Sequence, residues 1–327
     1  MQRPRFLPDN FILALIAAIV LATFLPIRGA AAAVYEHATT GAIALLFFLH
    51  GAKLSRAAVI AGASNWRLHL CVLAATFVLF PAIGLAAQPL LSDLLTPALA
   101  AGVLFVCLLP STVQSSIAFT SIAGGNVSAA VCSASASNLL GVFLTPALAG
   151  LLMSQAGHAG SSLSAVAHIV GEIVVPFAAG QIARAWIGGW VAAHPKLVKF
   201  VDQGSIVLVV YGAFSASVVD GLWHQIPLVA LGWLFVADAV LLAIALALTY
   251  GVGRALFARE DALVLLFCGS KKSLASGIPI AKVLFASSAL GAIVLPLMIF
   301  HQIQLIVCAG LARRAARYAP DSAPIRG

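Results

Sequence analysis

Charged residues are scarce in this chain of 327 residues. Asp, Glu, Lys and Arg together make up 9% of it, and only 10 residues are acidic, whereas hydrophobic residues make up 62%. A water-soluble protein needs more polar side chains than this to cover its surface, so the composition excludes a soluble enzyme and a soluble binding module. It predicts a polytopic α-helical membrane protein whose surroundings are the lipid bilayer.

Motifs for disulfides, metals and cofactors are also missing. The histidines form no His-x-x-x-His pair, and no Gly-Lys-Ser/Thr follows Gly124-Gly125, which excludes a phosphate-binding loop. The cysteines are odd in number, lie in apolar segments and show no zinc-ligand spacing. They are Cys71, Cys107, Cys132, Cys268 and Cys308. We therefore expect no disulfide framework, no metal site and no cofactor.

Long apolar segments are what the chain does contain. At roughly 20 residues per membrane helix, its length accommodates about ten spans. The first also resembles a secretory signal peptide, because Arg3 and Arg5 precede it and Ala30–Ala33 follows, but Arg28 disfavours cleavage and we interpret it as a span. We place the spans at 11–25, 37–51, 68–87, 97–123, 127–153, 163–183, 201–219, 227–251, 261–285 and 289–312.

Basic residues lie between the spans and not along one face. If the N-terminus is cytoplasmic and the spans alternate, the outer side carries Arg28, with Lys282 near an outer helix end. This bias predicts ten spans in the inner (plasma) membrane with both termini cytoplasmic, so the formal charge of +8 reflects orientation and not nucleic-acid binding. No pattern indicates an oligomeric state. The cytoplasmic group is Arg3, Arg5, Lys53, Arg56, Arg67, Arg184, Lys196, Lys199, Arg254, Arg259, Arg313, Arg314, Arg317 and Arg326.

The ninth span carries polar residues in its middle. Gly269-Ser270-Lys271-Lys272-Ser273 lies between apolar flanks, and Gly277 and Pro279 follow. Two ammonium groups at bilayer depth are costly unless water, a counter-charge or a substrate meets them. Because glycine, serine and proline also loosen a helix, we expect a discontinuous helix whose unwound centre carries the functional site.

The fourth span is interrupted in the same way, by Pro110-Ser111-Thr112-Val113-Gln114-Ser115-Ser116. Each interrupted span is the fourth of five, and a shift of 161 positions aligns Cys107 with Cys268. Paired broken helices at corresponding places are typical of inverted-repeat transporters. We therefore expect a single transmembrane domain, 1–327, with inverted five-helix repeats at 7–153 and 163–312 and a basic cytoplasmic tail at 313–327.

The residue types where the two breaks would cross favour an anion. Each resumed half-helix directs the partial positive charge of its N-terminus toward the crossing, and the lysines add full charges. Adjacent lysines cannot share a helical face, so a structural role for one of them remains open. We assign attraction of the anion to Lys272 first and Lys271 second. The other predicted substrate-binding residues are Ser111, Thr112, Gln114, Ser115, Ser116 and Ser273.

Four further residues are candidates for coupling. Asp238 lies in the eighth span and Glu172 in the sixth, and either could form a static ion pair with a lysine or carry a proton in alternation with it. Asn138 and Ser133 belong to the fifth span, where small hydroxyl residues also serve helix packing.

These motifs resemble a known family. The run CLLPSTVQSSIAFTSIAGGNVSAAVCSASASNLLGVFLTPAL resembles the crossover region of the bile acid:sodium symporter family, and FCGSKKSLASGIPIAKVLF is similar to its sodium/bile acid cotransporter 7 branch. The resemblance covers nearly the whole chain, and Lys272–Pro279 is its specific part. It implies a core of spans 3–5 and 8–10, a panel of spans 1, 2, 6 and 7, and alternating access around crossed spans 4 and 9.

The sodium sites of that family are altered here. Phe267 stands where the bile-acid branch has a Glu, and Lys271 and Lys272 stand where it has Gln and Asn. Loss of a carboxylate and gain of two ammonium groups should repel Na⁺. The residues therefore favour H⁺ or no coupling ion, with a lysine ammonium in place of bound Na⁺, whereas the family implies Na⁺. The other departures are Ser115-Ser116, Ala130 and Ala134.

We therefore predict a secondary-active, symporter-like carrier of a small organic anion, and not an enzyme. One alternative is a non-transporting membrane regulator of ion homeostasis or envelope traffic on a carrier fold. Another is an intramembrane enzyme that uses a lysine as base or Schiff-base former beside Ser273, although no His or carboxylate stands at a fixed spacing from a nucleophile. A carboxylate, a sulfate conjugate and a phosphate fit the predicted pocket equally well.

Overall fold

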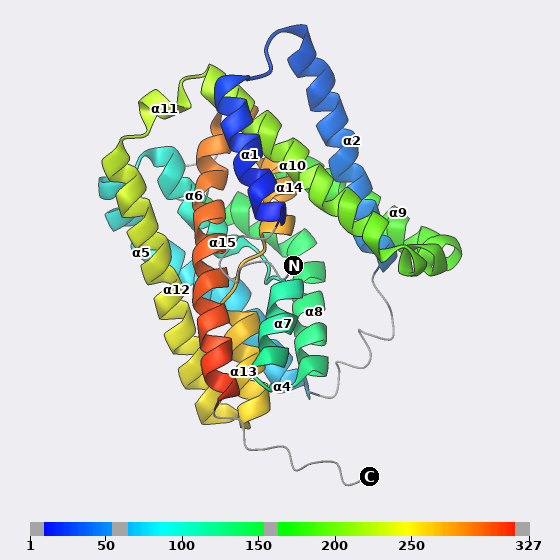
Figure 1. The fold of residues 1–327 in the computed structure, drawn as a ribbon, viewed down its shortest axis with the longest axis vertical. Helices are drawn as coiled ribbons and strands as arrows, with labels where there is room; N and C mark the ends of the chain where they lie inside the picture. The colour runs from blue at the N-terminus through cyan, green and yellow to red at the C-terminus, as the bar shows by residue number, and fades with distance from the viewer. Residues whose placement is uncertain (1–9, 54–64, 154–162, 318–327) are drawn as a thin grey trace, which may run out of the picture. The chain divides into compact units, whose positions relative to one another are not determined.

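The computed structural model describes residues 10–53, 65–153 and 163–317, and only the backbone of 163–172. Every regular element in these ranges is a helix (Figure 1). Seven of the helical segments described are long and apolar enough to cross a membrane. The chain is therefore an all-helical, multi-pass membrane protein. Outside the described residues lie Arg3, Arg5, Arg56, Arg326, residues 318–327 of the basic tail, and the Glu172 side chain.

Contacts divide the described chain into two compact units. Unit 1 holds spans 1, 2, 6 and 7, and unit 2 holds spans 3–5 and 8. α14 (Leu274–Leu284) and α15 (Ser287–Ala316), which the family resemblance places in the core, each have residues in both units. Unit 1 comprises the described residues of Met1–Leu54, Ser162–Leu228 and Ile278–Leu295, and unit 2 those of Ser55–Ser161, Val229–Gly277 and Pro296–Gly327.

Unit 1 consists largely of long helices packed side by side. α2 (Ala30–Lys53) lies along α9 (Leu163–Ala193), and α1 (Asn10–Phe24) lies along α10 (Pro195–Val219), which continues into the short α11 (Leu222–Gln225) (Figure 1). A Cβ atom at Gly51 would lie 2.1 Å from the Phe177 carbonyl oxygen of α9. Small residues are required there because the two backbones approach so closely.

Unit 2 is built around the interrupted spans. α6 (Pro97–Leu108) packs on α5 (Phe80–Leu94), and α13 (Arg259–Gly269) contacts α4 (Trp66–Ala74), α7 (Gln114–Ile122) and α8 (Val127–Leu148). α12 (Leu228–Leu256) belongs to the same unit from Val229 onward. α13 is buried from Ala262 to Gly269. The polar groups at its end therefore face protein and not lipid.

Two short π-helical segments lie in unit 2, and a proline follows the first of them closely. The π-helical segment η2 (Ala75–Leu79) joins α4 to α5, and η3 (Ala149–Met153) follows Pro146 in α8. In η2 the N–H of Phe80 pairs with the carbonyl of Ala75, five residues back. The same register would pair residue 81 with Thr76, but Pro81 has no N–H. The Thr76 carbonyl is thereby free to accept another donor.

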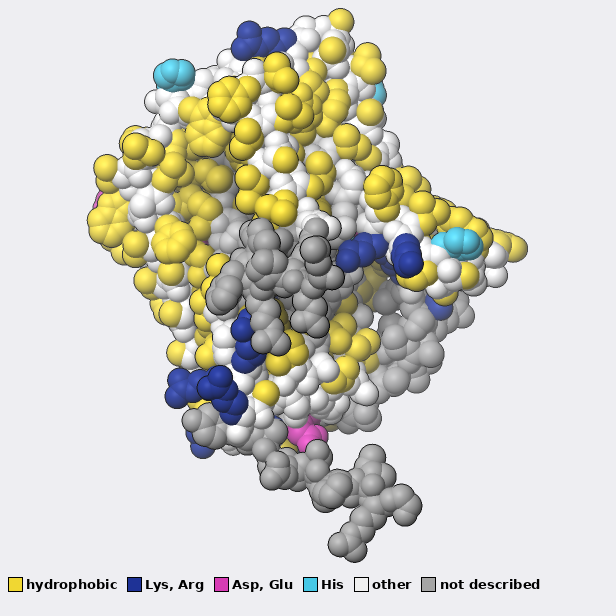
Figure 2. Space-filling view, in the orientation of Figure 1, with side chains coloured by type: hydrophobic (Ala, Val, Ile, Leu, Met, Phe, Trp, Pro, Cys, Tyr) yellow, Lys and Arg dark blue, Asp and Glu magenta, His cyan; other side chains and the backbone are white. Residues whose placement is uncertain are grey.

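The exposed surface is largely apolar. Figure 2 shows hydrophobic side chains over much of the visible face, with Lys and Arg in a few places and very little Asp or Glu. Large apolar side chains are strongly exposed in both units, among them Phe24, Trp186, Phe200, Leu228 and Ile306. Such exposure is unfavourable in water and is expected of helices that face lipid.

Candidate functional site

Both predicted interruptions are present in the structure. α6 ends because Leu109 precedes Pro110, which drives Leu109 into an extended conformation (ψ 155°). The chain has no helical pairing from there to Val113, and α7 begins at Gln114. In the ninth span α13 ends at Gly269 and α14 begins at Leu274, which leaves residues 270–273 outside either helix.

Side chains of the first interruption donate hydrogen bonds to the carbonyl groups at the end of α13. Ser111 Oγ donates to the carbonyl of Cys268 (2.5 Å), and Ser116 Oγ donates to the carbonyl of Phe267 (2.9 Å). The last carbonyls of a helix have no partner within it, so they need donors of this kind when they are buried. These hydroxyl groups are therefore occupied in holding the two interrupted spans together.

The other predicted residues of the two interruptions belong only partly to this network. The Ser273 N–H donates to the Pro110 carbonyl at 2.8 Å, which joins the interruptions a third time. Ser115 Oγ donates to Thr112 Oγ1 at 2.8 Å. Gln114 differs from the others because it is exposed at the start of α7.

The ammonium of Lys272 is enclosed by backbone carbonyls. Lys272 is fully buried, and its Nζ donates to the carbonyl oxygens of Thr76 (2.8 Å), Cys107 (2.9 Å) and Leu109 (2.8 Å). Nζ also lies 4.1 Å from the centre of the Phe80 ring. An ammonium has three N–H donors, so all of them are used within the protein. The partial negative charge at the C-terminus of α6 adds to the attraction.

Lys271 is equally buried but much less well paired. Its Nζ donates one hydrogen bond, 3.3 Å long, to Ser115 Oγ, and lies 4.4 Å from the Phe119 ring centre and 5.9 Å from that of Phe267. Within the ranges that the structure describes, the ion pairs join other residues and no carboxylate faces Lys271. Among the described residues, its charge is therefore met by one long hydrogen bond and two ring faces, with no carboxylate.

Gln304 of α15 holds the Lys272 backbone, and sequence analysis did not identify it. The Lys272 N–H donates to Gln304 Oε1 and Gln304 Nε2 donates to the Lys272 carbonyl, both at 2.9 Å. Gln304 is fully buried, and its Nε2 also lies 2.8 Å from His301 Nδ1. An amide inside a membrane span is costly to bury without such partners, which is the signal that could have revealed it.

Asp238 is isolated in the interior of unit 2. It is fully buried, and neither carboxylate oxygen has a hydrogen-bond partner among the described residues. It lies close enough to Cys107 and to the Phe300 backbone to interact electrostatically, without a hydrogen bond of normal geometry. The static ion pair between Asp238 and a lysine, which the sequence left open, is not formed.

The other coupling candidates have different surroundings. Asn138 Nδ2 donates to the Ser111 carbonyl (2.5 Å), and Asn138 Oδ1 accepts from Ser276 Oγ (2.6 Å), so this residue joins the network of the two interruptions. Ser133 Oγ lies 2.7 Å from His69 Nδ1 of α4 instead. Nothing in the described part of the chain gathers three His, Cys, Asp or Glu side chains as a metal site would need.

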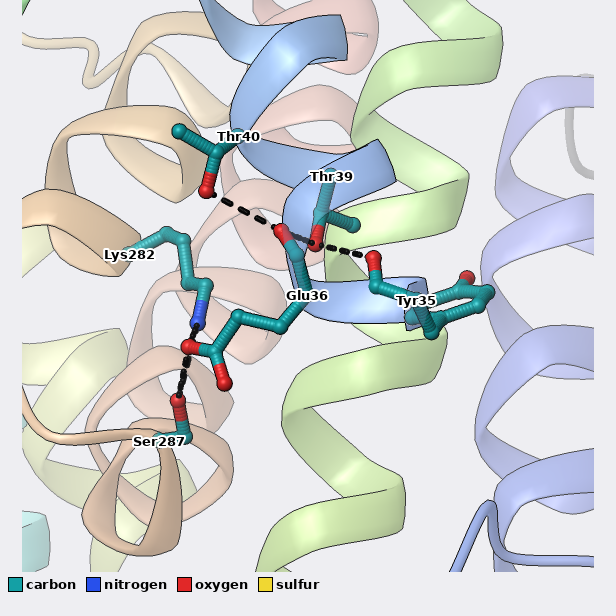
Figure 3. Close-up of polar contacts among 6 residues, drawn as sticks. All are labelled: Tyr35, Glu36, Thr39, Thr40, Lys282 and Ser287. Carbon is teal, nitrogen blue, oxygen red and sulfur yellow. Dashed lines mark hydrogen bonds and ion pairs between the residues drawn. The ribbon is translucent and has the colours of Figure 1, made fainter. Parts of the chain in front are cut away.

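A third lysine of the ninth span lies in unit 1. Figure 3 shows Glu36 of α2 directed toward Lys282 of α14 and Ser287 of α15. Lys282 Nζ lies 2.7 Å from Glu36 Oε1 and 2.8 Å from Ser287 Oγ. Because the Glu36 side chain is 56% exposed, solvent screens this pair and it contributes little to stability. The charge of Lys282 is thus paired with a carboxylate within unit 1, whereas among the described residues the charge of Lys271 in unit 2 is not.

Comparison with known proteins places the chain in a family. The sequence pattern of the SBF-like CPA transporter family matches residues 9–317. The chain belongs to this family. It is 61% identical over 324 residues to PA2026, an uncharacterized protein of Pseudomonas aeruginosa (99% of this chain, 97% of that protein). It is 54% identical over 313 residues to YfeH of Escherichia coli, which is named as a candidate symporter (94% and 93%). Sodium/bile acid cotransporter 7 of Mus musculus is 29% identical over 275 residues (81% and 79%).

The family confirms the resemblance drawn from the two interrupted spans. Its matched region includes both of them, together with the lysine pair. Membership of a transporter family indicates that the chain is a membrane carrier and not an enzyme. The network around Lys271 and Lys272 is accordingly its candidate functional site.

Proposed function

We propose that this chain is a secondary-active transporter that carries a small organic anion across the membrane, with Lys271 as the principal ligand of the anion and without need of Na⁺. The relatives support transport, since one is named as a candidate symporter and another as a sodium/bile acid cotransporter. Ten spans in two inverted five-helix repeats, with both termini cytoplasmic, would present the site to each side of the membrane in turn. The two interruptions, each in the fourth span of its half, support this arrangement.

The incomplete pairing of Lys271 is the observation that carries the proposal. A buried ammonium that uses one of its three N–H donors is unfavourable until a counter-charge reaches it. A carboxylate, sulfate or phosphate group would supply both the charge and the missing acceptors. Lys272 uses all three donors on the protein itself, so the geometry favours Lys271 for this role and Lys272 for a structural one.

The surroundings of Lys271 suit an anion. α7 begins at Gln114, and its N-terminal end adds partial positive charge and free N–H groups beside Ser115. Ser115 both accepts from Lys271 and lies at this N-terminus, so it would orient the bound group. Because Lys271 is fully buried in this structure, binding requires the opening that alternating access provides.

A screen for stabilising ligands tests the proposal. The purified protein is heated with carboxylates, sulfate conjugates and phosphates in turn, in Na⁺ and in choline, at two pH values. We expect an anion to raise the unfolding midpoint equally in both salts, by RT ln(1 + [L]/Kd) in free energy. We expect Lys271→Ala to abolish this rise and Lys282→Ala, a lysine already paired with Glu36, to retain it.

Three results would contradict the proposal in different ways. If Lys271→Ala bound the anion as tightly as the unaltered chain does, Lys271 would not be the ligand of the anion. Uptake into vesicles that requires Na⁺ and is unaffected by a proton ionophore would show that transport depends on Na⁺. Absence of stabilisation by every anion would favour the non-transporting regulator.

A further inference from the structure

The three carbonyls around Lys272 Nζ come from separate parts of unit 2. Thr76 belongs to η2, whose register leaves its carbonyl free because Pro81 has no N–H. Cys107 lies in the last turn of α6, and Leu109 is the extended residue that follows it. Each of these carbonyls therefore lacks a helical partner for a reason unconnected with Lys272. The oxygen atoms would stay in place if the lysine side chain were removed.

The arrangement favours a monovalent cation. Backbone carbonyls replace the hydration shell of such ions in selectivity filters. The Phe80 ring face at 4.1 Å and the C-terminal end of α6 both favour positive charge. No carboxylate oxygen is among the hydrogen-bond partners of Nζ, whereas divalent cations are usually held by carboxylates.

The lysine that occupies this site is fixed by its own backbone. Gln304 pairs with both the N–H and the carbonyl of Lys272, so the position of the residue does not depend on its side chain. Truncation of the side chain to alanine would leave three buried acceptors around the space of three methylene groups and an ammonium group. A free cation of ammonium size has the charge and the donors to take this place.

We propose that the carbonyls of Thr76, Cys107 and Leu109 form a monovalent-cation site that the protein fills with its own Lys272 ammonium, and that Lys272→Ala opens this site to free ammonium. What the site means for transport rests on the proposed function. Because the carrier holds its own cation, it would need no coupling cation from solution. The site itself is defined by unit 2 alone.

The test compares how the unfolding midpoints of two neighbouring lysine variants depend on the cation in solution. Lys272→Ala is purified in parallel in ammonium, methylammonium, potassium, sodium and choline chlorides of equal ionic strength, and its unfolding midpoint is measured in each. We expect ammonium to raise the midpoint by roughly several degrees above that in choline, saturably. Lys271→Ala is the matched control, because that lysine is equally buried but its Nζ donates to a hydroxyl group and, among the described residues, to no carbonyl, and we expect no difference between its salts.

The unaltered chain provides a second control, since its site is filled and ammonium should not affect it. Recovery of folded Lys272→Ala from ammonium but not from choline would also support the site. Equal midpoints in ammonium and choline, a response as large in Lys271→Ala, or recovery of folded Lys272→Ala from neither salt would overturn the inference. Chloride is the anion in every salt, so failure here leaves the anion-stabilisation result standing, and failure of the anion screen leaves this one standing.

Discussion

Gln304 of α15 and Lys272 of the interrupted ninth span form two hydrogen bonds, both 2.9 Å long, between one side-chain amide and both backbone groups of the lysine. A helix would have supplied these partners, but residues 270–273 lie between α13 and α14. The unwound segment can therefore stay buried because one amide replaces the missing helical pairing.

Replacement of this amide should be strongly destabilising. Gln304→Leu leaves a buried N–H and a buried carbonyl without partners, which costs about 2–5 kcal/mol in unfolding free energy. Gln304→Glu keeps the acceptor and loses the donor, so we expect an intermediate effect. Gln88→Leu is the control, since this buried glutamine donates only one hydrogen bond, to the Ala100 carbonyl at 3.2 Å. A drop in unfolding midpoint for Gln304→Leu no larger than for Gln88→Leu would contradict the prediction.

The two adjacent lysines should differ sharply when each is replaced by methionine. Lys272→Met leaves three buried carbonyls without a donor, at a cost of about 3–5 kcal/mol. Lys271→Met removes a buried charge that has one long hydrogen bond, so we expect a change within about 1 kcal/mol or a gain in stability. Thermal unfolding of both variants in the same detergent measures the difference. Equal losses would show that the two ammonium groups are equally well compensated.

The spans and their interruptions were predictable because apolar length, proline and glycine leave direct traces in a sequence. Pro110 ends α6 and Gly269 is the last residue of α13, as expected. The ends were less accurate: the third span, predicted at 68–87, extends from Trp66 to Leu94. Few helix ends here carry a polar cap that a sequence would reveal, Asn126 at the start of α8 being one, and some helices continue beyond the apolar window.

The environment of each lysine could not be predicted from residue types. The partners of Lys272 are backbone carbonyls, which every residue possesses, and only Pro81 hints that the Thr76 carbonyl is free. Asp238 was a reasonable ion-pair partner by charge, but its position on α12 leaves it without a hydrogen bond in the described structure. Composition thus identifies the charged groups, while the fold decides which of them is satisfied.

Contact between Gly141 of α8 and the first interruption offers a steric test. A Cβ atom at Gly141 would lie 2.6 Å from Pro110 Cβ and 2.7 Å from Pro110 Cγ, and a proline ring cannot turn aside as a flexible side chain can. We expect Gly141→Ala to lower stability by about 1–3 kcal/mol through overpacking. Gly251→Ala in α12, where an added Cβ meets nothing within 4 Å, should instead be neutral or stabilising by about 0.5–1 kcal/mol. Similar unfolding midpoints for the two variants would contradict this close approach.

Asp238 and Asp202 should respond oppositely to removal of the carboxylate. Asp202 accepts from Lys53, so Asp202→Asn breaks an ion pair and should lower the unfolding midpoint slightly. Asp238→Asn removes an acid that has no hydrogen-bond partner, so stability should be unchanged or higher, because a buried amide costs less than a buried charge. If Asp238 carries the coupling proton, uptake driven by a pH gradient in vesicles should disappear in Asp238→Asn and persist in Asp202→Asn. A large loss of stability in Asp238→Asn would mean that its carboxylate is paired in the folded protein. Retained pH-driven uptake would exclude Asp238 as the proton carrier and would mean that another group carries the proton.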